Sequence, residues 1–190
     1  MHAGEFIKEF AGLTDEGDYI IAPEALSRLY VKGDNGDVGA SWMTKEDREN
    51  EISDYVSYLD ELYDKEITPY KNKFTFKVYA LGFSQGAATL SRWLSYGHST
   101  PLMIDKTKID KAIFWCGNIA HDVDYSKSEQ FKNTSIYLVF AKNDQYYPSD
   151  FYKSQIELLN KYGIEPEYHV FEGKHEISGE LVKKLIFYDR

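Results

Sequence analysis

The chain has 190 residues, enough to bury a hydrophobic core without disulfide bonds or structural metal ions, and we expect one domain from residue 1 to residue 190. Its formal net charge of −9 repels the phosphates of nucleic acids and of anionic lipids, which excludes nucleic acid as a partner. A single cysteine, Cys116, excludes an internal disulfide, and no apolar run reaches the roughly 18 residues of a membrane span. Because the N-terminus also lacks the basic start and apolar stretch of a signal peptide, we expect a cytoplasmic protein without stable membrane insertion.

Short apolar runs alternate along the chain with segments of helical periodicity, which indicates an α/β protein with a mostly parallel sheet. Several of these runs are almost continuous, as expected for strands that are covered on both faces. The predicted strands cover residues 19–22, 75–81, 112–116, 135–141 and 167–171.

Helical spacing and capping residues predict helices around these strands. They cover residues 5–11, a segment that begins near Lys45 with Thr44 as its N-cap, residues 84–96 with Gly97 as the stop, residues 149–162 before Gly163, and a last segment capped by Ser178.

Residues 32–43 are rich in glycine, aspartate and asparagine and are predicted to form a loop. The acidic residues in this segment do not have the spacing of a calcium-binding helix–loop–helix. We therefore expect no metal site there.

The strongest chemical signal is the run Gly-Phe-Ser-Gln-Gly at residues 82–86, which directly follows a predicted strand and opens a predicted helix. Such a strand–turn–helix is typical of a nucleophile elbow, which would expose the hydroxyl of Ser84. Gly82 and Gly86 would be required because side chains at these positions would collide across the turn. The backbone N–H of Gln85, at the start of the helix, would stabilise the oxyanion of a tetrahedral intermediate.

A serine hydroxyl needs a base, and the chain has five histidines, His2, His98, His121, His169 and His175. His169 lies within a predicted strand, and His121 precedes any suitable acid. His175 follows the last predicted strand, at the edge of a parallel sheet where sites form, so it is the predicted base.

The acid of such a triad is expected at the end of the preceding strand. Asp144 follows the strand of residues 135–141 and would hold the imidazole of His175 in one tautomer. The alternative, Asp150, fits better as part of the first turn of a helix.

At this point the sequence resembles the phospholipase/carboxylesterase family, which includes acyl-protein thioesterases, within the α/β-hydrolase fold. The segments that carry the resemblance run in the family's order through most of the chain; they are residues 20–24, 40–43, 81–87, 143–145, 147–148 and 173–176. The Gly-Phe-Ser-Gln-Gly-Ala run at residues 82–87 is the most specific of them.

The resemblance implies a three-layer α/β-hydrolase fold with a mostly parallel central sheet. It also implies a serine hydrolase that cleaves a carboxylic ester or thioester of a small acyl substrate through an acyl-enzyme, with no cofactor and no metal. Trp42 and Met43 match a family segment that lies near the substrate cleft, although aromatic packing explains them equally well.

The family begins with a strand that ends in a His-Gly-x-Gly-type loop, and residues 1–4 are too few to form both. We therefore expect that N-terminal strand and its oxyanion loop to be missing from this chain. A non-catalytic or impaired α/β-hydrolase-like binding domain is the alternative function. We expect Cys116, at the end of an apolar strand, to be a structural residue.

Overall fold

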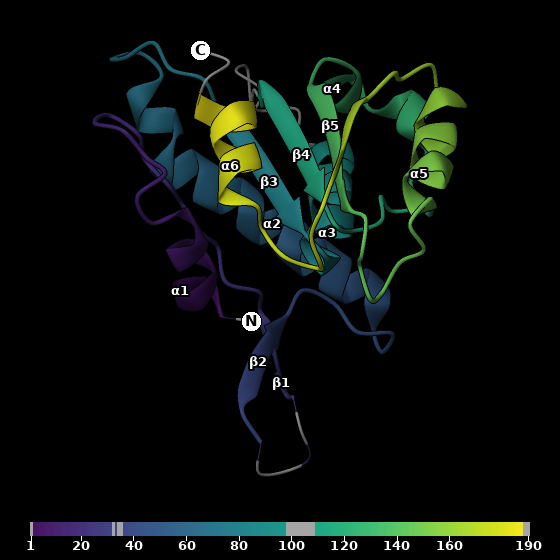
Figure 1. The fold of residues 1–190 in the computed structure, drawn as a ribbon. Helices are drawn as coiled ribbons and strands as arrows, with labels where there is room; N and C mark the ends of the chain where they lie inside the picture. Colours follow the sequence, from purple (N-terminus) through teal and green to yellow (C-terminus); the bar gives the residue numbers. More distant parts are fainter. Residues whose placement is uncertain (1, 32, 34–35, 98–108, 188–190) are drawn as a thin grey trace. The chain divides into compact units, whose positions relative to one another are not determined.

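The computed structural model describes residues 2–31, 33, 36–97 and 109–187 (Figure 1). The chain divides into two compact units, one formed by Met1–Glu51 with Ile177–Arg190 and the other by Ile52–Glu176. The larger unit contains a four-stranded parallel sheet, and the smaller one contains a two-stranded antiparallel hairpin. None of the helices within the described ranges is long and apolar enough to cross a membrane.

The parallel sheet confirms the α/β architecture expected from the sequence. Its strands β3 (Tyr79–Phe83), β4 (Lys111–Trp115), β5 (Ser135–Ala141) and β6 (Glu167–Phe171) follow one another in that order across the sheet. All neighbours pair in parallel. Every residue of β4 is buried, and so is every residue of β5 after Ser135, as predicted for strands covered on both faces.

Helices cover this sheet through the apolar faces that their sequences predict. Helix α3 (Gln85–Tyr96) packs against β3 and β4 and buries Ala87, Leu90, Trp93 and Leu94. The other helices of this unit are α2 (Arg48–Glu66, from Ile52 onward), α4 (Glu129–Lys132) and α5 (Phe151–Asn160), with short 3₁₀ turns at Thr68–Tyr70 and Tyr125–Lys127.

Two polar contacts join α2 to α3 inside the larger unit. The indole N–H of Trp93 donates to Asp60 Oδ1 at 2.7 Å, and the buried Arg92 reaches the hydroxyl of Tyr55 at 3.4 Å. Arg92 also forms a two-pronged ion pair with Asp122, at 2.8 and 3.2 Å. These contacts fix the helix that begins at Gln85.

The smaller unit begins with α1 (Ala3–Phe6), which continues as a 3₁₀ turn at Ile7–Phe10. Strands β1 (Ser27–Tyr30) and β2 (Val38–Ser41) form its hairpin. The chain returns to this unit at α6 (Gly179–Val182), which runs into a π-helical turn at Lys183–Phe187. Ser178 caps α6 by accepting a hydrogen bond from the N–H of Leu181, as predicted.

Two strand predictions were wrong. Residues 19–22 form no strand, and Tyr19 is 73% exposed. An apolar run becomes a strand only where a neighbouring strand accepts its backbone hydrogen bonds, so the apolar pattern alone was not sufficient here. The strand predicted at residues 75–81 begins only at Tyr79, since Phe74 and Phe76 are exposed. Among the strands that the structure describes, β3 pairs with β4 alone.

The loop predicted at residues 32–43 and the cap predicted at Thr44 also need correction. The end of that segment forms β2, which pairs with β1; residues 32, 34 and 35 of the predicted loop lie outside the described residues. Helix α2 begins at Arg48 because Asp47 has a positive φ of 44°, which interrupts the helical path from Thr44. Thr44 instead donates its N–H to Glu51 Oε2 at 2.6 Å.

Candidate active site

Ser84 lies in the tight turn between β3 and α3, where the sequence predicts a nucleophile elbow. Its φ of 54° and ψ of −119° are unusual for a residue with a side chain, and such a conformation costs about 1–3 kcal/mol. Two hydrogen bonds hold the turn: the Ser84 N–H donates to Trp115 O at 2.9 Å, and the Ala87 N–H donates to Ser84 O at 3.0 Å. The strain is typical of an elbow that presents a nucleophile.

Glycines allow the backbone to pack this closely around Ser84. A Cβ on Gly82 would meet Gly86 O at 2.3 Å, which confirms the predicted collision at that position. The same prediction is wrong for Gly86, where a Cβ would meet nothing within 4 Å. Gly117 is a further close contact that the sequence did not reveal, since a Cβ there would lie 2.2 Å from Ser84 O. Gly117 therefore lets the chain after β4 touch the elbow.

The two glycines of the motif provide a matched pair of variants. We expect Gly82→Ala to lower the free energy of unfolding by about 1–3 kcal/mol or more, because backbone atoms must move to admit the methyl group. Gly86→Ala should change it by no more than about 1 kcal/mol, and in the stabilising direction, since Gly86 lies in the first turn of α3. Urea unfolding of both variants measures the difference, and equal destabilisation would contradict it.

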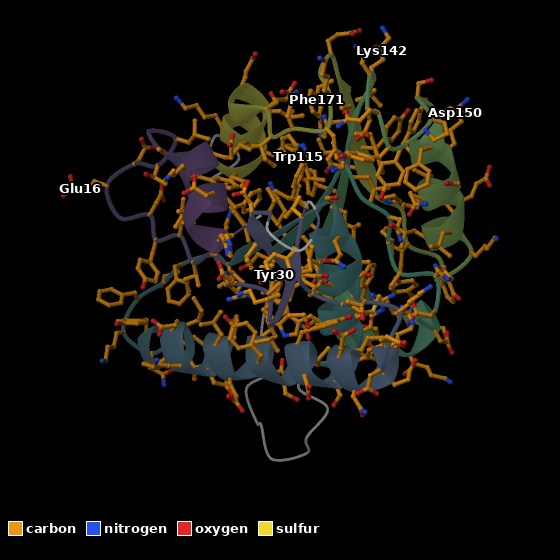
Figure 2. All side chains as sticks on the ribbon, turned by 90° about the horizontal axis from the view of Figure 1, so that it is seen from below. Glu16, Tyr30, Trp115, Lys142, Asp150 and Phe171 are labelled. Atoms are coloured by element: carbon orange, nitrogen blue, oxygen red, sulfur yellow. The ribbon has the colours of Figure 1, made fainter. Side chains whose placement is uncertain are left out.

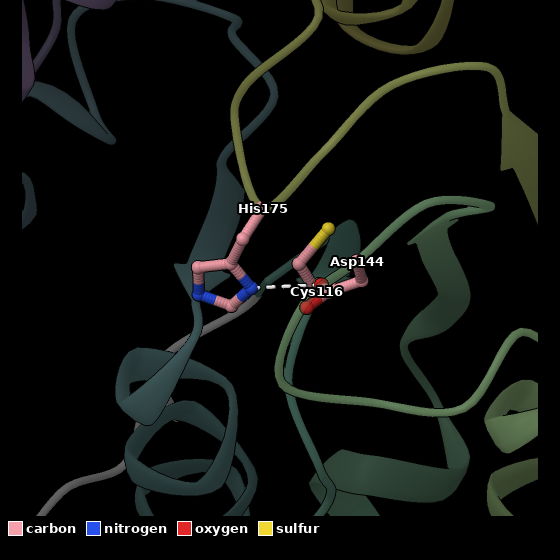
Figure 3. A group of neighbouring side chains, drawn as sticks. All are labelled: Cys116, Asp144 and His175. Carbon is pink, nitrogen blue, oxygen red and sulfur yellow. Dashed lines mark hydrogen bonds and ion pairs between the residues drawn. The ribbon is translucent and has the colours of Figure 1, made fainter.

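Asp144 and His175 meet beyond the carboxyl ends of β5 and β6. His175 Nδ1 and Asp144 Oδ2 are 2.8 Å apart (Figure 3), and their side chains are only 9% and 3% exposed. Because the carboxylate accepts, Nδ1 carries the proton and Nε2 is the basic nitrogen. Asp144 Oδ1 accepts a second hydrogen bond from the N–H of Tyr146 at 2.8 Å.

The loops that carry this pair are fixed by backbone contacts that extend the β5–β6 ladder. The N–H of Lys142 donates to Phe171 O at 2.9 Å, and that of Asn143 donates to Gly173 O at 3.0 Å. The buried indole of Trp115, at the end of β4, donates to Glu176 O at 2.9 Å, and its ring centroid lies 5.7 Å from that of Phe171; both residues are labelled in Figure 2. Glu176, the residue after His175, is thereby bound to β4, whose Trp115 O also accepts the hydrogen bond of the Ser84 N–H.

Aromatic rings surround the His175 imidazole. Phe83, directly before Ser84, lies with its ring centroid 4.8 Å from that of His175. Tyr146 packs edge to face at 4.7 Å. The imidazole therefore lies beside the elbow and contacts both Phe83, from the motif around Ser84, and Tyr146, from the loop that follows Asp144.

The other candidates for base and acid lie elsewhere in the described structure. His169 is within β6, with its ring stacked parallel to that of Tyr137 at 6.3 Å. His121 is exposed in a turn, and His2 contacts Glu24 in the smaller unit. His98 falls outside the described residues. Asp150 is exposed at the start of α5.

Trp42 and Met43, the predicted cleft residues, follow β2 in the smaller unit and are half-buried. Arg48 Nη1 lies 3.2 Å from the Met43 sulfur, and Ser41 Oγ donates to Met43 O at 3.0 Å. These contacts are internal to that unit, so a role in a cleft stays a prediction.

Cys116 lies beside the acid–base pair, which the sequence analysis missed (Figure 3). Its Sγ, a carboxylate oxygen of Asp144 and a ring nitrogen of His175 all lie within 4.8 Å of one another. Sulfur, oxygen and nitrogen at these distances could hold a metal ion. Burial raises the pKa of the Cys116 thiol to about 12, so the thiol carries its proton when no metal ion is bound. Within this group the structure shows one hydrogen bond, between His175 Nδ1 and Asp144 Oδ2.

A family model described as phospholipase/carboxylesterase matches residues 19–188. The chain belongs to the phospholipase/carboxylesterase family. Membership places it among hydrolases, and the motif around Ser84 and the Asp144–His175 pair lie within the matched range. No curated protein matched the sequence significantly.

Solved structures with the same fold agree with this family assignment. SOBER1 of Arabidopsis thaliana aligns with a TM-score of 0.72 at 17% identity, covering 97% of this chain and 90% of the other. Acyl-protein thioesterase 2 of Zea mays gives 0.66 at 15% identity, over 97% and 86% of the two chains. A carboxylesterase of Bacillus cereus gives 0.63 at 15% identity, over 97% and 80%. At these identities the likeness confirms the α/β-hydrolase fold of this phospholipase/carboxylesterase family member.

Proposed function

We propose that this protein is a serine hydrolase that cleaves a carboxylic ester or thioester of a small acyl substrate through an acyl-enzyme. The observation that carries the proposal is the pair of Asp144 and His175, hydrogen-bonded at 2.8 Å, with the His175 ring packed on the residue that precedes Ser84. A serine in a strained turn, a histidine and a buried carboxylate together supply what acyl transfer requires.

In the proposed first half-reaction, Ser84 Oγ attacks the carbonyl carbon and its proton passes to Nε2 of His175. Asp144 holds the Nδ1–H and stabilises the imidazolium that forms. The carbonyl oxygen becomes an oxyanion, which the N–H of Gln85 at the start of α3 would stabilise. When the intermediate collapses, the bond to the alcohol or thiol breaks, and that leaving group takes the proton from His175.

In the second half-reaction, water donates a proton to His175 and attacks the acyl-enzyme. The carboxylic acid leaves, and Ser84 Oγ recovers its proton. Every step uses side chains and backbone amides of this chain, so we propose no cofactor and no metal. We also retain Trp42 and Met43 as proposed cleft residues, while the cytoplasmic location and the single domain expected from the sequence stay predictions.

Activity-based labelling tests this proposal directly. The protein should react with a fluorophosphonate probe at Ser84, as read from the labelled peptide by mass spectrometry, and should lose p-nitrophenyl acetate hydrolysis in proportion. A short-chain acyl thioester, assayed in parallel, separates esterase from thioesterase turnover. Heat-denatured protein is the control for nonspecific labelling.

Two outcomes would overturn the proposal. Labelling at another residue would move the nucleophile away from Ser84. Folded protein that neither reacts with the probe nor turns over either substrate would favour the alternative, a non-catalytic α/β-hydrolase-like binding domain.

A further inference from the structure

Tyr146 is an exposed aromatic residue that the proposed mechanism does not use. Its ring packs edge to face on the imidazole of His175, with the two centroids 4.7 Å apart and the two planes at 76°. Tyr146 is nevertheless 69% exposed, whereas the side chain of His175 is only 9% exposed. One side of the tyrosine ring therefore covers the base, and much of the remaining ring faces solvent.

The backbone holds this ring beside the acid–base pair. The N–H of Tyr146 donates to Asp144 Oδ1 at 2.8 Å, while Asp144 Oδ2 binds His175 Nδ1 at the same distance. The next residue, Tyr147, is anchored in turn, because its ring stacks on that of Phe151 with the centroids 4.3 Å apart. The ring of Tyr146 thus keeps its place at the base while an open surface remains for a ligand.

The proposed reaction brings the leaving group to this ring. The alcohol or thiol takes its proton from Nε2 of His175, so its oxygen or sulfur must come within about 3 Å of that nitrogen. Asp144 binds the other ring nitrogen, which leaves Nε2 for the substrate. The acyl group stays bonded to Ser84, and the leaving group is the part of the substrate that is brought to the imidazole and to the tyrosine ring packed on it.

We propose that Tyr146 is a specificity-determining residue whose exposed ring binds the leaving group and favours esters and thioesters of an aromatic alcohol or thiol. The inference rests on the proposed function, because it names the class of substrate that the Ser84 site prefers. Two aromatic rings attract one another in offset or edge-to-face contacts by more than the area that they bury, and a short alkyl group does not reproduce this attraction. An aromatic leaving group would also remove the apolar surface of Tyr146 from water.

Two acetate esters with the same acyl group isolate the leaving group. Phenyl acetate and ethyl acetate form the same acetyl-enzyme, so their kcat/KM values differ only through the acylation step. The intrinsic reactivity of each ester cancels when variants are compared. We expect Tyr146→Ala to lower the ratio of kcat/KM for phenyl acetate to that for ethyl acetate about fivefold, the effect of one lost aromatic contact. Tyr146→Phe keeps the ring and should keep the ratio.

Two further variants control for exposure and for side-chain volume. Tyr168→Ala removes another exposed tyrosine of the same unit, whose ring stacks on that of Tyr152 at 5.4 Å, and it should keep the wild-type ratio. Tyr146→Leu retains apolar volume without an aromatic ring and should lower the ratio as the alanine variant does. If Tyr146→Ala does not fold, the leucine variant decides the result.

The inference and the proposed function fail in different ways. If the wild-type protein hydrolyses both esters and the alanine and leucine variants at Tyr146 change the two kcat/KM values by the same factor, the ring only shields or positions His175 and the inference is wrong. If the folded wild-type protein hydrolyses neither ester and does not react with the fluorophosphonate probe, the proposed function fails and the inference fails with it.

Discussion

Replacing Ser84 with alanine should lower kcat for p-nitrophenyl acetate by about 10⁴- to 10⁶-fold, because no other group of the proposed site could form the acyl-enzyme. Alanine at a φ of 54° carries the same backbone strain as serine, so the fold should persist. The loss should therefore appear in steady-state kinetics without a large change in melting temperature.

The control for this variant is Ser149→Ala, an exposed serine just before α5. It should retain wild-type turnover and fluorophosphonate labelling at Ser84. A Ser84→Ala protein that keeps turnover within tenfold of the wild type would show that the nucleophile lies elsewhere.

Replacing Asp144 with asparagine should lower kcat about 10⁴-fold, since an amide NH₂ facing Nδ1 favours the wrong tautomer of His175. The amide oxygen can still accept the hydrogen bond of the Tyr146 N–H, so the loop should keep its conformation. We expect KM to change little, because the carboxylate acts on the imidazole and not on the substrate.

Asp150→Asn is the matched control, because it makes the same chemical change at the exposed start of α5. It should leave kcat at the wild-type value. If the two variants gave the opposite result, Asp150 would be the acid.

A parallel comparison of His175→Ala with His169→Ala tests the base, and the His169 variant should mainly alter stability, because its ring packs on Tyr137 within the sheet.

The sequence predicted the centre of the sheet well, because burial on both faces leaves a strong pattern. Strand β5, in the interior of the sheet, begins and ends where the apolar run at residues 135–141 does. The strand predicted at residues 167–171 also matches the bounds of β6, although β6 pairs only with β5 among the described strands and is largely exposed. The proximity of Asp144 and His175 followed from the same reasoning, since parallel strands bring their carboxyl ends to one edge.

The parts that the sequence did not reveal depend on partners far along the chain. Strand β2 is hidden in a glycine-rich segment, because its pairing with β1 and not its composition makes it a strand. The contact of Gly117 with Ser84 and the place of Cys116 beside Asp144 both follow from the register of β3, β4 and β5. Local periodicity does not specify that register, so these two residues went unrecognised.

The parallel order of β3 to β6 has a consequence for how the molecule acquires its site. The elbow, the acid and the base come from the ends of three strands, and long segments of chain separate them. Each parallel pairing must close a long loop, and the conformational entropy of that loop is lost before the contacts between the strands stabilise the pair. Such sheets therefore fold slowly. Among the strands that the structure describes, β6 is the last along the chain and pairs with β5 alone, so a chain that emerges from its N-terminus contains Ser84 and Asp144 before it can place His175. The pairing of β6 with β5 is thus the step that completes the proposed group of Ser84, Asp144 and His175.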